Sequence, residues 1–257
     1  MATQLDGPLP STARQLQRPA IGCERLQCGQ ELGPGVRVGL SVKRVRVVVL
    51  IGACAVVGNL LGQQALQLVA ADLANPEDVA RLAREAGEVD VLVNNAGVAS
   101  FGPSASISSD QYDAMLNSNL RAVYLLTAAL APKMAERGGG SVINVSSGSG
   151  TIGDVNNAVY AATKAAVNAL TRAWAAEYGP SGVRVNAVAP GPVLTSVPAE
   201  YLQGYVPLIP LRRIGQPEDV GEVIAFLAGP GGSYVSGATI PVDGGLTAVE
   251  PPKPGYL

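Results

Sequence analysis

Histidine is absent from this chain of 257 residues, and cysteine and the larger aromatic residues are scarce. The absence of histidine excludes His-based catalytic triads, His metal ligands and His proton shuttles, and we expect no metal site. Only three Cys, one Trp and two Phe are present. Three Cys in so long a chain do not make a disulfide framework, so we expect a cytoplasmic protein in a reducing compartment.

The sequence also lacks an excess of basic charge and a long hydrophobic run. It holds 18 Lys and Arg against 20 Asp and Glu, a net charge of −2, which does not favour nucleic acid as a partner. The longest uncharged apolar run, Val47–Gly58, has 12 residues, fewer than the ~18 that cross a membrane. The length suits one α/β domain or two small ones.

Charge and cysteine usage change sharply near residue 62. Residues 1–62 hold 7 basic and 3 acidic residues and all three Cys, whereas residues 63–257 hold 11 basic and 17 acidic residues and no Cys. We therefore divide the chain into an atypical segment (1–62), an α/β domain that carries the site (63–250) and an exposed, proline-rich tail (251–257).

Short apolar strands alternate with longer helical segments after residue 63. The predicted strands are Ala65–Ala70, Val89–Val93, Val142–Val145, Val183–Val188 and Ala238–Val242. The predicted helices are one that begins at Asn75–Asp78, one over 109–136, one over Ala158–Tyr178 and one that begins at Gln216–Asp219. Because such alternation requires right-handed crossovers, we predict a doubly wound parallel sheet in a single α/β domain.

Polar or glycine-rich residues follow each predicted strand. They are Asp72, Asn94–Gly97, Ser146–Gly148 and Pro190–Pro192. In doubly wound sheets, ligands bind beyond the carboxyl ends of the strands. The pattern therefore indicates a cofactor crevice at this edge.

Tyr160 and Lys164 lie at positions i and i+4 of a predicted helix, so their side chains share one face. A free tyrosine has a pKa of ~10 and is a poor base at neutral pH. A cation within ~4–6 Å stabilises the phenolate. We therefore predict that Lys164 lowers the pKa of Tyr160, which then donates and accepts a proton.

Two further polar residues lie near this pair in the predicted fold. Ser147 follows a strand thirteen residues before Tyr160; its hydroxyl either bonds a substrate carbonyl or bonds the backbone of its own turn. Asn119 lies inside a predicted helix, where asparagine is mildly unfavourable. It either bends the helix or holds a water molecule.

These motifs, taken in order, resemble the classical short-chain dehydrogenase/reductase family, in its 3-oxoacyl-carrier-protein-reductase-like branch. The resemblance covers about residues 63–245. It is carried by Asp72-Leu73, Asn94-Asn95-Ala96-Gly97, Asn119, Ser147, Tyr160 with Lys164, Pro190-Gly191 with Thr195, and Val242-Asp243-Gly244-Gly245. It implies a Rossmann-like fold and an oxidoreductase that uses NAD or NADP, a choice that the sequence leaves open.

The resemblance also implies a role for each matching residue. Tyr160 is the catalytic acid and base, Lys164 assists it and binds the nicotinamide ribose, Ser147 orients the substrate carbonyl, and Asn119 anchors a water molecule. The implied cofactor-binding residues are Asp72, Leu73, Asn95, Ala96, Gly97, Tyr160, Lys164, Pro190, Gly191, Val193 and Thr195.

The glycine-rich turn with which this family begins is missing from its expected place. The nearest substitute is a strand at Val47–Ile51 followed by Gly52 and Gly58, but we interpret this spacing as ordinary packing. Residues 8–62 are either a diverged segment with an altered cofactor site or the product of a displaced reading frame, and the abrupt change in cysteine and charge usage favours the second. Translation of the source DNA in its other two frames separates these alternatives.

We predict an oxidoreductase that interconverts a ketone and a secondary alcohol; the alternative is a non-catalytic scaffold or oligomer partner. Residues 196–210 are expected to cover the substrate. Their apolar residues Tyr201, Leu202, Tyr205, Leu208 and Ile209 favour an apolar or ring-bearing substrate, although core or interface positions would explain them equally. The family resemblance also implies a homotetramer or homodimer.

Overall fold

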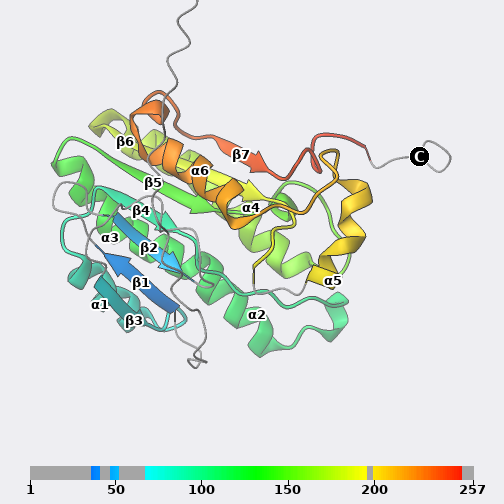
Figure 1. Ribbon diagram of the computed structural model, residues 1–257. Coiled ribbons are helices and arrows are strands. Elements are labelled where there is room, and N and C mark those ends of the chain that lie inside the picture. Colours follow the sequence, from blue (N-terminus) through cyan, green and yellow to red (C-terminus); the bar gives the residue numbers. More distant parts are fainter. Residues whose placement is uncertain (1–35, 41–46, 52–66, 196–198, 251–257) are drawn as a thin grey trace, which may run out of the picture. The chain divides into compact units, whose positions relative to one another are not determined.

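The computed structural model describes residues 36–40, 47–51, 67–195 and 199–250 (Figure 1). All of them belong to one compact unit, Leu32–Leu257. The three Cys, the Gly52–Gly58 spacing and the tail lie outside the described residues. Among the described helices, none combines the length and the hydropathy that a membrane span requires.

One seven-stranded sheet forms the centre of this unit, in the order β3-β1-β2-β4-β5-β6-β7. The strands are β1 (Val36–Leu40), β2 (Val47–Ile51), β3 (Gln67–Ala71), β4 (Val91–Asn94), β5 (Gly140–Val145), β6 (Val183–Pro190) and β7 (Thr239–Val242). From β2 through β4, β5, β6 and β7 every pairing is parallel. The predicted α/β fold with a parallel core is confirmed.

Strand β1 departs from the all-parallel sheet that the sequence predicts. It pairs antiparallel with both β2 and β3. Only residues 41–46 connect it to β2, and a parallel crossover needs a dozen residues or more. The short connection therefore forces a hairpin, and the amino end of β1 lies at the edge where β2 and β3 end.

Six α-helices accompany the sheet in the described part of the chain. They are α1 (Pro76–Ala86), α2 (Ser109–Leu116), α3 (Ala122–Glu136), α4 (Ala158–Tyr178), α5 (Ala199–Leu202) and α6 (Pro217–Ala228). Shorter 3₁₀ turns span Ser104–Ser106, Gly148–Gly150, Gly179–Ser181, Gln203–Leu208 and Pro230–Gly232. The predicted helix over 109–136 is present, but a π-helical turn, Asn117–Arg121, divides it into α2 and α3.

Side-chain hydrogen bonds explain where α1, α2 and α6 begin. Asn75 caps α1 through a hydrogen bond from the Glu77 backbone N–H to its Oδ1 (2.9 Å). Ser108 and Gln111 form a reciprocal capping box at the start of α2. Asp219 accepts from the Gln216 backbone N–H at the start of α6 (2.7 Å). The predicted helix starts at Asn75 and Gln216 are therefore correct.

Helices cover both faces of the sheet (Figure 1). On one face, α1, α3 and α4 bury Leu82, Leu126 and Trp174 against the strands. On the other, α6 buries Ile224 and Leu227 against β4, β5 and β6. The carboxyl edge of the strands remains between these layers, where the sequence predicts the site.

A row of buried polar side chains crosses the sheet below this edge. The Asn94 amide donates to Asn144 Oδ1 (2.8 Å) and to Thr127 Oγ1 (3.2 Å), and the Asn144 amide donates to Thr171 Oγ1 (2.9 Å). The row joins β4 and β5 to α3 and α4. Because these groups are buried, removal of one side chain leaves its partner without a hydrogen bond and without water to replace it, and this lowers the stability of the fold.

Asn144→Ala should destabilise the protein more than the loss of an exposed cap. It leaves the Asn94 amide without its 2.8 Å acceptor, which should lower the free energy of unfolding by about 2–4 kcal/mol. The control Ser108→Ala removes the α2 cap and should lower it by about 1 kcal/mol. Urea denaturation of both variants measures the difference; an equal loss would contradict this role for the row.

Candidate active site

A cavity of about 840 Å³ opens at the carboxyl edge of the sheet. Residues that follow β4, β5 and β6 line it, together with one face of α4. The predicted site residues along its wall are Asn95, Gly97, Ser147, Tyr160, Lys164, Pro190, Gly191, Val193 and Thr195. Motifs up to a hundred residues apart in the chain therefore meet at one place.

Tyr160 and Lys164 lie one turn apart on α4, as their spacing predicts. The Lys164 Nζ lies over the tyrosine ring, 5.6 Å from its centroid. It also donates to the carbonyl oxygen of Val145, at the end of β5 (2.9 Å). Lys164 is only 4% exposed, so its ammonium is held inside the protein against the end of a strand.

Burial shifts both groups toward their neutral forms. It lowers the pKa of the Lys164 ammonium to about 8. It also raises the pKa of the Tyr160 hydroxyl, while a hydrogen bond with Ser147 acts in the opposite direction. The sequence predicts that Lys164 lowers the pKa of Tyr160, whereas in the structure desolvation outweighs the other contributions and the pKa of Tyr160 is raised.

Of the two tasks that the sequence leaves open for Ser147, the structure shows the bond to the backbone of its own turn, and the bond to a substrate carbonyl stays a prediction. Ser147 caps the Gly148–Gly150 turn, because its Oγ accepts from the Ser149 backbone N–H (3.2 Å). Its side chain is also hydrogen-bonded to Tyr160. With one lone pair of Oγ occupied by the turn, its hydroxyl hydrogen remains available to a neighbouring oxygen.

Asn119 lies in the π-helical turn and is fully buried. Its side chain accepts from the Val98 backbone N–H and donates to the Val98 carbonyl oxygen, both at 2.8 Å. It donates as well to Thr163 Oγ1 on α4 (3.2 Å). The expected distortion of the helix is present, and Asn119 does not line the cavity but fixes the chain that does.

Two glycines, Gly97 and Gly191, lie in crowded parts of the cavity wall. A Cβ on Gly97 would lie 3.2 Å from Asn119 Oδ1 and 3.4 Å from Lys164 Nζ. A Cβ on Gly191 would lie 2.7 Å from that of Asp243. Position 191 therefore needs glycine, and a side chain at Gly97 would crowd Asn119. Asn95, Thr195 and Lys164 line the same cavity. The residues present fit a nicotinamide riboside.

Three predicted cofactor-binding residues do not line this cavity. Leu73 and Ala96 are buried in the core, at 2% and 3% exposure. Asp72 is exposed after β3, and its Oδ1 accepts from the Ala74 backbone N–H (2.9 Å). Their contact with the cofactor stays a prediction.

The structure adds Phe101, which the sequence does not single out. Its ring is 68% exposed, lies 6.1 Å from the Tyr160 ring and lines the cavity. Of the residues expected to cover the substrate, Leu202, Tyr205 and Leu208 line the cavity, whereas Ile209 is buried. The side chain of Tyr201 lies outside the described residues. An aromatic residue in a short loop after β4 is the one signal that could have pointed to Phe101.

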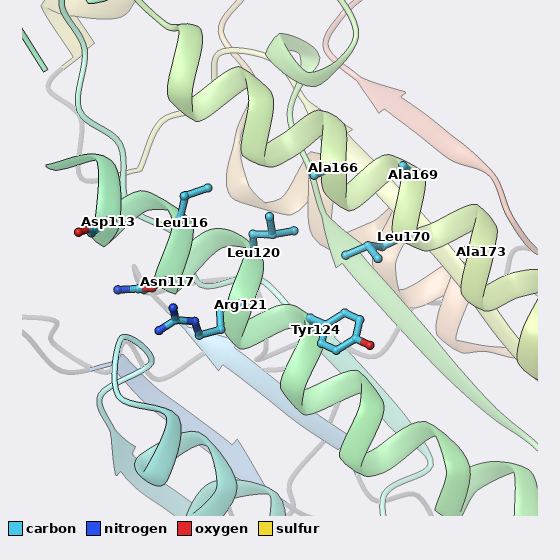
Figure 2. Close-up of a pocket in the computed structure, with 10 residues that line it drawn as sticks. All are labelled: Asp113, Leu116, Asn117, Leu120, Arg121, Tyr124, Ala166, Ala169, Leu170 and Ala173. Carbon is cyan, nitrogen blue, oxygen red and sulfur yellow. The ribbon is translucent and has the colours of Figure 1, made fainter. Parts of the chain in front are cut away.

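A second concavity, of about 700 Å³, lies outside the site (Figure 2). Its floor is formed by the Asp113–Tyr124 segment and α4, and its lining is mostly apolar: Leu116, Leu120, Tyr124, Ala166, Ala169, Leu170 and Ala173. Tyr124 is half exposed there. Asp113 and Arg121 add one charge of each sign to the border.

Comparison with known proteins gives consistent matches. The family described as enoyl-(acyl carrier protein) reductase matches residues 52–247. The 3-oxoacyl-[acyl-carrier-protein] reductase FabG of Thermotoga maritima is 40% identical over 174 residues, which cover 66% of this chain and 71% of that protein. The cis-4-hydroxycyclohexanecarboxylate dehydrogenase of Sinomonas cyclohexanicum is 36% identical over 237 residues, which cover 84% and 95%.

Solved structures give the same picture. A blue fluorescent protein from a metagenomic library, in complex with NADPH, superposes with a TM-score of 0.66 and 38% sequence identity. The match covers 68% of this chain and 74% of that one.

Lys164→Met should stabilise the protein at neutral pH. Burial lowers the pKa of Lys164 from an ordinary 10.5 to about 8. Below pH 8 the Lys164 ammonium is charged in both the folded and the unfolded chain, and its burial destabilises the folded state. Between pH 8 and 10.5 the folded chain loses this proton while the unfolded chain keeps it, so the wild type gains stability as the pH rises. The variant should exceed wild type by about 1–3 kcal/mol at pH 7, and the difference should shrink across that range.

Thermal unfolding between pH 6.5 and 10.5 measures this difference. Lys133→Met is the control, because Lys133 is exposed on α3 and its ammonium stays in solvent on folding. A gap between wild type and Lys164→Met that did not change with pH would contradict a buried ammonium.

Proposed function

This chain belongs to the short-chain dehydrogenase/reductase family of NAD(P)-dependent oxidoreductases, and we propose that it interconverts a ketone and a secondary alcohol with Tyr160 as acid and base. The observation that carries the proposal is the meeting of Ser147, Tyr160 and Lys164 in one cavity, with a Ser147–Tyr160 hydrogen bond. NAD or NADP is the cofactor; the choice depends on residues outside the described part.

The nicotinamide ring, when bound, supplies hydride to the carbonyl carbon or accepts it from the alcohol. Ser147 holds the substrate oxygen through its hydroxyl hydrogen, because the Ser149 N–H already occupies one lone pair of Oγ. Tyr160 then gives its proton to that oxygen, so the ketone becomes an alcohol and Tyr160 a phenolate. In the reverse direction the phenolate takes the proton back.

Tyr160 is suited to act as the proton donor at neutral pH. A tyrosine hydroxyl is protonated there, and burial raises its pKa further, so Tyr160 holds the proton that ketone reduction consumes. The Lys164 ammonium, close to the ring, offsets the negative charge that develops when the proton leaves. Two of its three hydrogens remain after the bond to Val145, and these are available to ribose hydroxyls.

Exposed apolar side chains support an apolar substrate. Six of them line this one cavity: Val98, Phe101, Ile152, Tyr205, Leu208 and Val249. Isolated exposed hydrophobic residues are ordinary, but a group that borders a concave site is typical of a binding surface. The substrate body would be held by these side chains and its carbonyl by Ser147 and Tyr160.

Tyr160→Phe should abolish turnover and keep cofactor binding. The variant lacks the hydroxyl that transfers the proton, so kcat/KM for ketone reduction should fall by about 10²–10⁴-fold. NADPH and NADH affinities, measured by calorimetry, should change little. Tyr112→Phe is the matched control, because Tyr112 is exposed on α2 and does not line the cavity.

The calorimetry also separates the alternative of a non-catalytic scaffold. A wild-type chain that binds neither NADH nor NADPH and turns over no ketone would favour the scaffold. Undiminished turnover by Tyr160→Phe would instead contradict the role of Tyr160.

We also propose that the second concavity is covered by a second copy of the chain (Figure 2). Its apolar lining favours burial, and Asp113 and Arg121 supply opposite charges on one surface. A twofold interface requires such self-complementarity, since each residue meets the partner residue across the axis. A homodimer or homotetramer would bury the half-exposed ring of Tyr124.

Ala169→Glu should convert this oligomer to a monomer. Ala169 is exposed on α4 and lines the concavity, so a carboxylate there would be buried without a partner in the interface. Ala176→Glu is the control, because Ala176 is exposed on the same helix outside the concavity. Light scattering measures the mass; an oligomer that survives Ala169→Glu would contradict the proposed interface.

A further inference from the structure

Three connecting segments of the chain contribute to the wall of the active-site cavity: residues 98–108, 147–159 and 191–216. Arg212 and Arg213, at the end of the third, line a different concavity. Among the described residues of these segments that line the active-site cavity, the charged one is Asp154. A site that recognises a carboxylate ordinarily offers it Arg or Lys, and this lining offers an acidic side chain instead.

Lys164 is the cation among the described residues that line the cavity, but its charge is not available to a substituent of the substrate away from the carbonyl. It is 4% exposed, and its Nζ is bonded to the Val145 carbonyl oxygen beside the Tyr160 ring. Its charge is therefore placed at the reacting end of the cavity.

Asp154 is exposed on the cavity wall and is free of ion pairs within the described part of the chain. Its Oδ2 accepts from the Asn157 amide (3.3 Å), and Asn157 is 3% exposed. The amide therefore orients the carboxylate, and among the described residues no donor bonds its Oδ1. This oxygen can accept from a substrate ammonium or hydroxyl group, and it repels a substrate carboxylate.

Apolar side chains near Asp154 strengthen its effect on a substrate. Ile152 precedes it in the same loop, and Phe101 lines the same cavity. The Gly102 backbone N–H donates to the Asn156 carbonyl oxygen (2.8 Å), which joins the two loops. A ligand between them displaces water, and charges interact more strongly where water is excluded.

We propose that Asp154 is a specificity-determining residue, and that the substrate is an apolar ketone that is neutral or carries a positive charge, not a carboxylate. This inference rests on the proposed function, because it concerns the same cavity. It adds the sign of the substrate's charge, which the apolar lining does not give.

Three ketones that differ in one ring substituent test the proposal on the full-length protein. They are 4-methylcyclohexanone, 4-(dimethylamino)cyclohexanone and 4-oxocyclohexanecarboxylate, reduced at pH 7 with NADPH or NADH. We expect kcat/KM for the carboxylate to be at least about fivefold below that for the amine. This ratio should shrink in 0.5 M salt, because Asp154 is accessible to ions.

Asp154→Asn should reduce the amine-to-carboxylate ratio to about one. Glu222→Gln removes the same charge from an exposed position on α6 outside the cavity, so it should keep the wild-type ratio. A wild-type preference for the carboxylate, or an unchanged ratio in Asp154→Asn, would overturn the proposal.

A binding measurement separates this inference from the proposed function. Saturation-transfer NMR ranks the three ketones by affinity without turnover. If no ketone is reduced, the proposed function fails; the charge inference still stands if the amine binds more tightly than the carboxylate, and fails if it does not.

Discussion

The buried ammonium of Lys164 is the constraint on which the rest of the site depends. Its Nζ bonds the last carbonyl of β5, while the Ser146 hydroxyl donates to the Lys164 carbonyl oxygen (3.1 Å). The end of β5 and the first turns of α4 therefore hold each other at two points. A charge that is removed from water needs such fixed partners, and the same contacts bring Ser147 to Tyr160. Burial of Lys164 lowers the stability of the fold, and the same burial places its ammonium in one cavity with the hydroxyls of Ser147 and Tyr160.

The second support comes from Asn119. By bonding both backbone groups of Val98 and also Thr163, it ties the chain after β4 to α4. Thr163 in turn donates to the Tyr160 carbonyl oxygen (2.7 Å). The π-helical turn places this amide where a regular helix would direct it elsewhere. These bonds fix the ends of two strands and two helices relative to one another around the cavity. A fixed geometry suits hydride and proton transfer, which require the donor and acceptor atoms to lie at a set distance.

Much of this arrangement could be predicted from local features of the sequence. Asn75 and Gln216 mark helix starts through their own side chains, and the i, i+4 spacing of Tyr160 and Lys164 is a property of one helix. The rule that parallel strands end at one edge then brings Ser147 to them. The antiparallel direction of β1 was missed, because it depends on a short connection between strands that the sequence pattern did not define. The direction of the Tyr160 pKa shift and the place of Phe101 were missed because desolvation and exposure depend on distant neighbours.

The left-handed backbone of Asn156 (φ 62°) bears on how such a site could change over evolutionary time. This residue presents its carbonyl oxygen to Gly102, so the loop of Phe101 and the loop of Asp154 are fastened together. Because this bond joins the two loops, they cannot separate to admit a larger substrate unless the bond breaks. Leu202, Tyr205 and Leu208 line the same cavity from a different segment of the chain, which this hydrogen bond does not include. A change in the size of these side chains would therefore alter the space for a substrate without breaking the bond between the two loops.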